Sequence, residues 1–220
     1  MKQDDDKFLI ALPKGRILKE IRPVFEQCGI KIEDDCFDEN SRRLRFSTNM
    51  NRLDCIRVRA FDIATIVAYG GAHIGIAGSD VINEFDYDVL LSPLDFGIGK
   101  CRLSVAVKEG DAEQDHPQNW SYINVATKYP NLTKYYFRER GVEANCIKLN
   151  GAMEIVPEIG MARKIVDLVS TGATLKANNL VEVEKIMDVS TRLIINKACA
   201  KTIPEDLLAI VESFERVLNA

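Results

Sequence analysis

The sequence predicts an α/β protein built of two lobes with a ligand cleft between them. Short apolar runs, typical of strands buried on both faces of a parallel sheet, alternate repeatedly with a turn and an amphipathic helix. This rhythm is interrupted by one polar stretch, Lys108–Asn119, which contains Gly110 and Pro117. A chain of 220 residues is long enough for two small domains, each with its own core.

The first lobe is expected to open with a buried strand and an amphipathic helix. Phe8–Leu12 is almost entirely apolar, and Pro13–Arg16 turns the chain into a helix with one apolar stripe that Gly29 closes. Pro23 lies inside that stripe and predicts a kink or a looser turn. The other elements expected here are strands at 44–47, 54–59 and 73–78, a short helix capped by Asp62, and a helix that opens at Ser79–Asp80.

A second series of strands and helices follows the polar stretch. After an alternating strand at 101–107, we expect strand 123–126 with helix 131–140, strand 145–149 with helix 152–161, strand 165–169, and a late strand at 193–195. Thr202 would cap a last helix with Pro204 in its first turn and an apolar stripe of Leu207, Leu208, Val211, Phe214 and Leu218. Because that stripe needs a sheet to cover, we expect domain I to comprise residues 1–101 plus 192–220, and domain II residues 102–191.

Composition narrows the class of protein. A net charge of −4 argues against a general nucleic-acid binder. The six cysteines occur singly with no C-x-x-C spacing, no secretion signal is present, and the longest uncharged run, 63–79, is broken by Gly70 and Gly71. We therefore expect a cytoplasmic protein with no membrane contact and reduced thiols. The isolated His73 and His116 suggest no zinc site, and we expect no metal held by protein side chains.

The segment Asp167–Leu180 is the strongest candidate for a binding site. Ser170–Thr174 falls where a β-branched strand turns into a helix, and unpaired N–H groups at such a turn bind phosphate. Gly172 would let the backbone close on the ligand, the hydroxyls of Ser170, Thr171 and Thr174 would add donors, and Asp167 would accept from a sugar hydroxyl. An ordinary Ser/Thr-capped helix start explains the same residues equally well.

Cations at other strand ends suggest further anion contacts. Lys14 and Arg16 oppose the dipole of the helix that they open, and a bound anion would resolve this conflict, although a solvated turn is the simpler alternative. Arg42 and Arg43 add positive charge, as do Arg57 and Arg59, which strand alternation puts on one face. For at least one of these two pairs, the alternative is a solvent-exposed surface with no ligand.

Two further strand ends carry candidate residues. Lys128 follows strand 123–126 as a candidate for a phosphate, and Tyr129 would either stack on a base or pack. Glu154 is expected in a first helical turn, where a carboxylate suits both capping and a ribose hydroxyl.

Six motifs in order resemble those of the ATP phosphoribosyltransferase family. They are Leu12–Arg16, Ser41–Leu44, Arg59–Ile63, Gly75–Asp80, Ala126–Tyr129 and Asp167–Leu175. The resemblance covers about residues 8 to 200. It implies a fold like the type II periplasmic binding proteins and an active site between the lobes. The chain is similar to the short form, which lacks a C-terminal regulatory domain and assembles with a regulatory subunit resembling histidyl-tRNA synthetase.

The resemblance also implies an activity. The family condenses adenine N1 of ATP with phosphoribosyl pyrophosphate in the first step of histidine biosynthesis, with substrate-bound Mg²⁺. Arg16, Arg42, Asp167 and Glu154 would be the catalytic residues, with Arg42 acting across the interface of a homodimer inside the hetero-oligomer. Phosphoribosyl pyrophosphate would contact Glu154, Asp167, Ser170, Thr171, Gly172, Ala173 and Thr174. ATP or pyrophosphate would contact Lys14, Gly15, Arg16, Arg42, Arg59, Lys128 and Tyr129.

Two other functions remain open from the sequence. The same two-lobed fold serves non-catalytic solute-binding or sensor domains, because a fold does not determine a function. Another phosphoribosyl-transferring enzyme, with a different nucleophile, would need the same phosphate loop.

Overall fold

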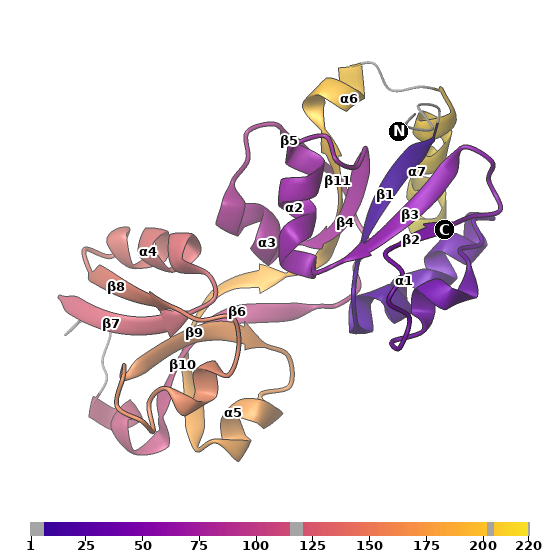
Figure 1. The fold of residues 1–220 in the computed structure, drawn as a ribbon. Helices are drawn as coiled ribbons and strands as arrows, with labels where there is room; N and C mark the ends of the chain where they lie inside the picture. Colours follow the sequence, from indigo (N-terminus) through magenta and orange to yellow (C-terminus); the bar gives the residue numbers. More distant parts are fainter. Residues whose placement is uncertain (1–6, 115–120, 202–204, 220) are drawn as a thin grey trace. The chain divides into compact units, whose positions relative to one another are not determined.

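A computed structural model describes residues 7–114, 121–201 and 205–219 (Figure 1). The chain forms two compact units, Met1–Gly99 with Ser190–Ala220, and Lys100–Val189. These boundaries fall two residues before those expected at 101/102 and 191/192. The predicted α/β class is confirmed, since each unit is a sheet covered by helices.

The first unit holds one sheet and most of the helical residues. Its elements are β1 (Phe8–Pro13), α1 (Arg16–Gln27), the 3₁₀ helix η1 (Asp34–Phe37), β2 (Arg45–Ser47), β3 (Leu53–Val58), α2 (Ala60–Ala68), β4 (Ile74–Gly78), α3 (Ser79–Phe85), β5 (Leu90–Asp95), β11 (Thr191–Asn196), α6 (Lys197–Lys201) and α7 (Glu205–Leu218). The strand order is β2-β3-β1-β4-β11-β5, and β1 runs parallel to both β3 and β4.

Both faces of the first sheet are buried. Ile10 and Leu12 of β1 enter a core with the apolar face of α1, whereas Ala11 points to the opposite core with α2 and α3. This is the environment for which a continuous apolar strand is selected, because neither face meets water. The expectation of a doubly covered β1 is confirmed.

Helix α7 covers the same face of the first sheet as α1. Phe214 is fully buried, and its ring lies edge-on to Phe25 of α1 with 5.0 Å between the centroids. Such an aromatic pair adds about 0.5–1.5 kcal/mol to the burial of the two rings. The buried positions of α7 are Leu207, Ile210 and Phe214, so the predicted stripe is wrong at Leu208, which is 42% exposed. The predicted cap, Thr202, and Pro204 lie outside the described residues.

The second unit holds a five-stranded sheet of order β10-β6-β9-β7-β8. Its strands β9, β7 and β8 are parallel neighbours, and β6 runs antiparallel to both β9 and β10. The elements are β6 (Cys101–Lys108), η2 (Glu109–Gln114), β7 (Tyr122–Thr127), α4 (Pro130–Arg138), β8 (Glu143–Lys148), η4 (Met153–Ile155), β9 (Lys164–Val169), α5 (Ala173–Ala177) and β10 (Leu180–Val189).

Several predicted elements differ from the structure. The helix expected at 152–161 is only the 3₁₀ turn η4, because Pro157 and Gly160 break a helical pattern. Asp62 is not the cap of α2; it lies in the first turn, and its N–H donates to the carbonyl of Arg59 at 2.9 Å. Pro23 lies inside α1, which continues on both sides of it.

Two strands, β5 and β10, were not predicted. In β5 most residues are exposed, and β10 is half-buried along most of its length, so neither has the apolar run of a buried strand. Among the cysteines, Cys36 and Cys55 are buried, whereas Cys28 and Cys101 are only partly buried. Within the described residues, no helix is both long and apolar enough to cross a membrane.

His73 links β1 to the start of β4 and gives the first unit a pH-dependent contact. The N–H of Leu9 donates to Nδ1 of His73 at 3.1 Å, and burial lowers the pKa of the imidazole below its ordinary value. Only the neutral ring accepts this bond, because both nitrogens of a protonated ring are donors.

We predict that the free energy of unfolding falls as the pH is lowered through about 6.5, because the unfolded histidine then binds a proton that the folded one resists. Above that pH the contribution is constant. His73→Asn keeps an acceptor oxygen near the position of Nδ1 and does not titrate, so urea unfolding of this variant should depend less on pH between 5 and 7. An unchanged pH profile in the variant would show that other groups control it.

Candidate functional site

In the first unit, three β–α junctions lie side by side at one edge of the sheet. Pro13 of β1 pairs with Val58 of β3, and the N–H of Lys14 donates to the carbonyl of Val58 at 2.9 Å. Lys14 and Arg59 therefore leave neighbouring parallel strands at the same edge. The end of β4, at Gly78, belongs to this edge as well, because β4 pairs in parallel with β1. This is the edge where open α/β sheets place ligands.

The turn before α1 has a backbone that only glycine adopts readily. Gly15 has φ 92° and ψ −145°, and it is the N-cap residue of α1, with no side-chain cap and no acidic residue in the first turn. Arg16 is exposed, and its nearest carboxylate is that of Glu20, with 3.4 Å between Nε and Oε1. The helix thus starts with a cation and without an anion, which leaves its N-terminus unneutralised.

The arginines of the segment 42–59 divide into structural and available groups. Arg57 is 4% exposed and donates to the carbonyls of Cys36, Asp38 and Ser41, each at 2.6 Å. It therefore fixes the loop after η1, and its expected place on one face with Arg59 is wrong, because β3 ends before Arg59.

Three other arginines of this segment, Arg42, Arg43 and Arg59, differ in whether they have an ion-pair partner. Arg43 pairs with Glu33 at 2.6 Å and with Asp35 at 3.3 Å. Arg42 and Arg59 are exposed, and neither makes an ion pair with any residue that the structure describes. Arg42 and Arg59 are therefore the arginines of this segment that remain available to a ligand.

In the second unit, the same arrangement recurs at the carboxyl edge of β9, β7 and β8. Thr127 of β7 pairs with Val166 of β9 and with Lys148 of β8. Lys128 directly follows Thr127 and Asp167 directly follows Val166, so both residues come next after one paired position of two adjacent strands. Glu154 lies in η4, which follows β8. The strand pairing therefore brings two of the predicted residues of this unit, Lys128 and Asp167, to the same edge of the sheet.

The loop between β9 and α5 has open backbone donors. Ser170, Thr171 and Gly172 fall between the end of β9 at Val169 and the start of α5 at Ala173, as the sequence predicts. The N–H of Ala173 is taken by Oγ1 of Thr171 at 3.3 Å. The N–H groups of Thr171 and Gly172 have no hydrogen-bond partner in the part of the chain that the structure describes. Gly172 has φ 79°, a left-handed conformation that turns the chain into α5.

The remaining predicted residues of the second unit differ in exposure. Ala173 and Thr174 are exposed, and Asp167, Lys128 and Glu154 are half-buried. Oδ1 of Asp167 accepts the N–H of Leu168 at 2.8 Å. Tyr129 is only 2% exposed, so of its two proposed roles the structure favours packing over stacking on a base.

An ion pair behind this loop escaped prediction from the sequence. Arg102 of β6 pairs with Glu182 of β10, with 2.6 Å between Nε and Oε1, and its Nη1 donates to the carbonyl of Ser170 at 3.2 Å. The hydrogen bonds from Arg102 lower the pKa of the Glu182 carboxyl. The sequence offered one signal, an arginine inside a mostly apolar strand, but its partner Glu182 lies on β10, one of the two strands that were not predicted.

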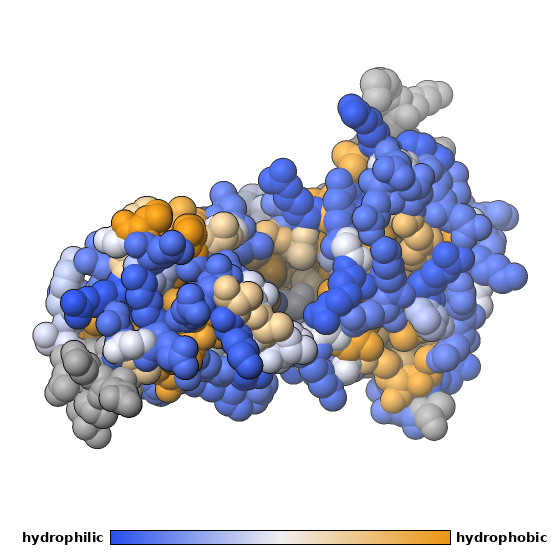
Figure 2. Space-filling model, turned by 90° about the horizontal axis from the view of Figure 1, so that it is seen from below, coloured by the Kyte–Doolittle hydropathy of each residue, from blue (hydrophilic) through white to orange (hydrophobic). Residues whose placement is uncertain are grey.

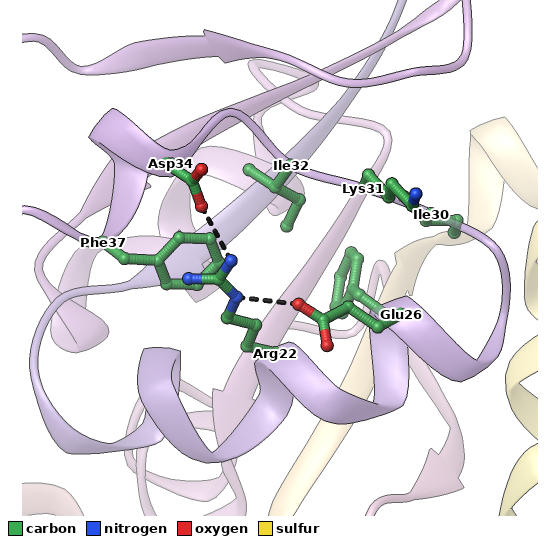
Figure 3. A pocket seen from close by; sticks show the side chains of 8 residues that line it. Arg22, Glu26, Ile30, Lys31, Ile32, Asp34 and Phe37 are labelled. Atoms are coloured by element: carbon green, nitrogen blue, oxygen red, sulfur yellow. Dashed lines mark hydrogen bonds and ion pairs between the residues drawn. The ribbon is translucent and has the colours of Figure 1, made fainter.

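Two pockets lie within single units. Figure 3 shows a pocket of about 370 Å³ beside α1, where Arg22 bridges Glu26 and Asp34 and its guanidinium lies 4.4 Å from the centroid of the Phe37 ring. Two cations, Arg22 and Lys31, and two carboxylates line this pocket, and Arg22 is already paired with both carboxylates, so the pocket has little net charge to attract an anion. A second pocket, of about 290 Å³, includes Gly172 and Glu182 and adjoins the 170–174 loop.

One face of the described part of the chain is largely polar (Figure 2), and this part has no preformed cluster of metal-binding side chains. Hydrophilic residues cover most of the face drawn in Figure 2, with apolar patches between them. No group of three or more His, Cys, Asp or Glu side chains among the described residues is arranged to hold a metal ion. The candidate site therefore consists of backbone donors, cations and two carboxylates.

Together, the two sheets with cations and a donor loop at their carboxyl edges define an α/β protein that binds phosphorylated ligands. Comparisons with known proteins make this class specific. A family model described as ATP phosphoribosyltransferase matches residues 59–216. The chain is 57% identical over 215 residues to the ATP phosphoribosyltransferase of Rhodospirillum rubrum, covering 98% of this chain and 95% of that protein. It is 54% identical to that of Paramagnetospirillum magneticum, with 96% of each chain covered.

A solved structure agrees with these sequence matches. It is titled "ATP phosphoribosyl transferase (HisG:HisZ) complex from Thermotoga maritima", and it matches with a TM-score of 0.81 and 28% identity over 96% of this chain and 98% of that one. The chain belongs to the ATP phosphoribosyltransferase family. Its fold is of the type II periplasmic-binding-protein class, as the resemblance implied.

Proposed function

We propose that the protein joins adenine N1 of ATP to C1 of the ribose of phosphoribosyl pyrophosphate, releasing pyrophosphate, as the first step of histidine biosynthesis. Family membership supports this activity. The observation that carries it at the level of residues is the 170–174 loop, because the N–H groups of Thr171 and Gly172 have no partner among the described residues and suit a terminal phosphate.

The second unit would hold the phosphoribosyl end of the substrate. Ser170–Thr174 bind the 5′-phosphate, and Asp167 of β9 and Glu154 of η4 accept from the ribose hydroxyls. When the bond from C1 to pyrophosphate breaks, positive charge develops on the sugar. A nearby carboxylate stabilises that charge more in the transition state than in the ground state.

The first unit would hold the phosphate groups of ATP and the departing pyrophosphate. Lys14, Gly15, Arg16 and Arg59 share one edge of its sheet, and arginine suits phosphate because its planar fork donates two parallel hydrogen bonds. Adenine N1 carries no proton in the neutral base, so the reaction needs no general base to expose it. The work of these cations is to orient ATP and to neutralise the leaving group.

Mg²⁺ fits this chemistry as an ion carried by the substrate. It prefers oxygen ligands and keeps much of its shell on phosphates and water, where it would neutralise charge on the pyrophosphate. The carboxylates proposed for the ribose site are those of Asp167 and Glu154, both half-buried. Lys128 would add a cation beside them.

We also propose partners and a compartment. The matched structure is a HisG:HisZ complex, which supports a regulatory subunit resembling histidyl-tRNA synthetase for this chain as well. We infer a homodimer within that hetero-oligomer, in which the exposed Arg42 reaches the site of the neighbouring subunit. All six cysteines are free, which suits a reducing compartment, and we place the enzyme in the cytoplasm.

The direct test is to incubate the protein with ATP, phosphoribosyl pyrophosphate and Mg²⁺, with and without the regulatory subunit, and to follow the ultraviolet absorbance of the adenine ring. We expect a change that requires both substrates. Binding of the substrates without product in either preparation would indicate a solute-binding domain. A product formed when another nucleophile replaces ATP would indicate a different phosphoribosyl-transferring enzyme.

Replacing Arg16 should affect the chemical step more than the fold. We predict that Arg16→Ala lowers kcat on the order of 10²-fold, by analogy with the loss of one oxyanion donor. Its exposed pair with Glu20 contributes at most about 1 kcal/mol to stability. Arg22→Ala, one turn and a half further along α1, is the matched control. Wild-type kcat in Arg16→Ala would remove Arg16 from the mechanism.

Gly172 tests the phosphate loop itself. A Cβ there would meet only Cγ1 of Val169 at 4.0 Å, so space is available, but the positive φ costs an L residue about 1–2 kcal/mol. We predict that Gly172→Val turns the loop donors away and weakens phosphoribosyl pyrophosphate binding at least about tenfold, with ATP binding retained. Gly141→Val carries a similar strain at φ 72° with nothing within 4 Å and should bind normally. If calorimetry gives Gly172→Val and the wild-type protein the same affinity for phosphoribosyl pyrophosphate, the loop does not bind the phosphate.

A further inference from the structure

Arg102 connects two strands and the phosphate loop through one guanidinium. Its Nε and Nη2 donate to the two carboxylate oxygens of Glu182, and its Nη1 donates to the carbonyl of Ser170. The three residues lie on β6, on β10 and at the first position after β9. All of these contacts lie within the second unit.

We propose that Arg102 is a positioning residue for the 170–174 loop, aligning its donors for the 5′-phosphate of phosphoribosyl pyrophosphate without touching the substrate. This inference rests on the proposed function of that loop. It adds Arg102, Glu182 and Ser104 to the residues on which substrate affinity depends.

The peptide geometry explains how a bond to a carbonyl directs a donor. The peptide unit is planar, and in its trans form the C=O and the following N–H point in opposite directions. Holding the carbonyl of Ser170 toward Arg102 therefore points the N–H of Thr171 to the other side of the loop. That N–H is one of the two without a partner among the described residues.

The network is built to fix the guanidinium rather than only to neutralise it. Oγ of Ser104, a residue 1% exposed, donates to Oε1 of Glu182 at 2.8 Å. Ser104 and Arg102 lie on the same strand and both engage Glu182. The side chain of Arg102 is 34% exposed and that of Glu182 23%, so the pair is partly screened from water. The planar guanidinium of Arg102 donates to both carboxylate oxygens of Glu182 and still has Nη1 to donate to Ser170. A lysine ammonium on a flexible side chain does not reproduce this geometry.

A second ion pair, whose carboxylate also lies on β10, provides the matched control. Arg140 lies 3.4 Å from Glu184 of β10 and over the ring of Tyr136, at 3.6 Å from its centroid. Like Arg102, Arg140 is a cation that pairs with a glutamate of β10, but among the described residues it makes no hydrogen bond or ion pair with the 170–174 loop. Losing Arg140 should therefore lower stability without altering substrate affinity.

The experiment compares Arg102→Met, Arg102→Lys and Arg140→Met in the full chain with its regulatory subunit. It measures kcat, the KM of each substrate, and the melting temperature. Calorimetry with ribose 5-phosphate, a probe of the 5′-phosphate end alone, is run on the same proteins. We expect both Arg102 variants to raise the KM of phosphoribosyl pyrophosphate and the Kd of ribose 5-phosphate on the order of tenfold, with the KM of ATP unchanged. Arg140→Met should leave all three values unchanged.

The outcomes separate this inference from the proposed function. If Arg102→Met lowers only the melting temperature and the affinities stay at wild-type values, Arg102 is structural and the proposal is wrong. If Arg102→Met does not fold, Arg102→Lys, which retains the charge opposite Glu182, decides in the same way. If the wild-type protein forms no product but binds ribose 5-phosphate, the proposed function fails, and the shift in Kd still tests Arg102.

Discussion

The parallel pairing of neighbouring strands is the constraint that positions the candidate binding residues in each of the two units. In a parallel pair, residues that follow matched positions emerge at the same edge, so the pairing of Pro13 with Val58 delivers Lys14 and Arg59 together. The pairing of Thr127 with Val166 does the same for the residues after β7 and within β9. Shifting either register by one residue would reverse the faces of a whole strand and place its side chains against the wrong neighbours. The hydrophobic cores therefore fix the positions of the charged groups.

Burial then decides which charges are available to a ligand. Arg57 and Arg59 are two residues apart, yet the guanidinium of Arg57 donates to three loop carbonyls, whereas Arg59 is exposed to solvent. The desolvation of a buried arginine is offset by these charge-assisted bonds, each stronger than a neutral one. The loop that it holds leads directly into Arg42. A structural arginine thus sets the position of a proposed functional one.

The sequence predicts the β9-to-α5 turn correctly because every signal there is local: a β-branched strand, a glycine and helix-favouring residues. It also predicts β1 and its following turn. It fails at Glu182, because the half-buried strand β10 mixes charged and apolar residues and depends on β6 for its identity. The same limit applies to Tyr129, whose burial is a property of the folded unit and not of its neighbours in the chain. Local chemistry is readable from the sequence, whereas long-range partners are not.

The length of α5 changes the physical account of the phosphate loop. With five residues, Ala173–Ala177, this helix has little more than one turn, too short to sum a macrodipole of the size found in long helices. Anion binding here therefore depends mainly on the directions of individual N–H groups, and those directions are set by the peptide planes of Ser170 and Thr171. The guanidinium of Arg102 holds the carbonyl of Ser170 and so orients the peptide plane between Ser170 and Thr171 before the substrate binds. This lowers the entropy cost of ordering the loop on binding. The ion pair behind the loop thus takes over the orienting role that a longer helix would provide.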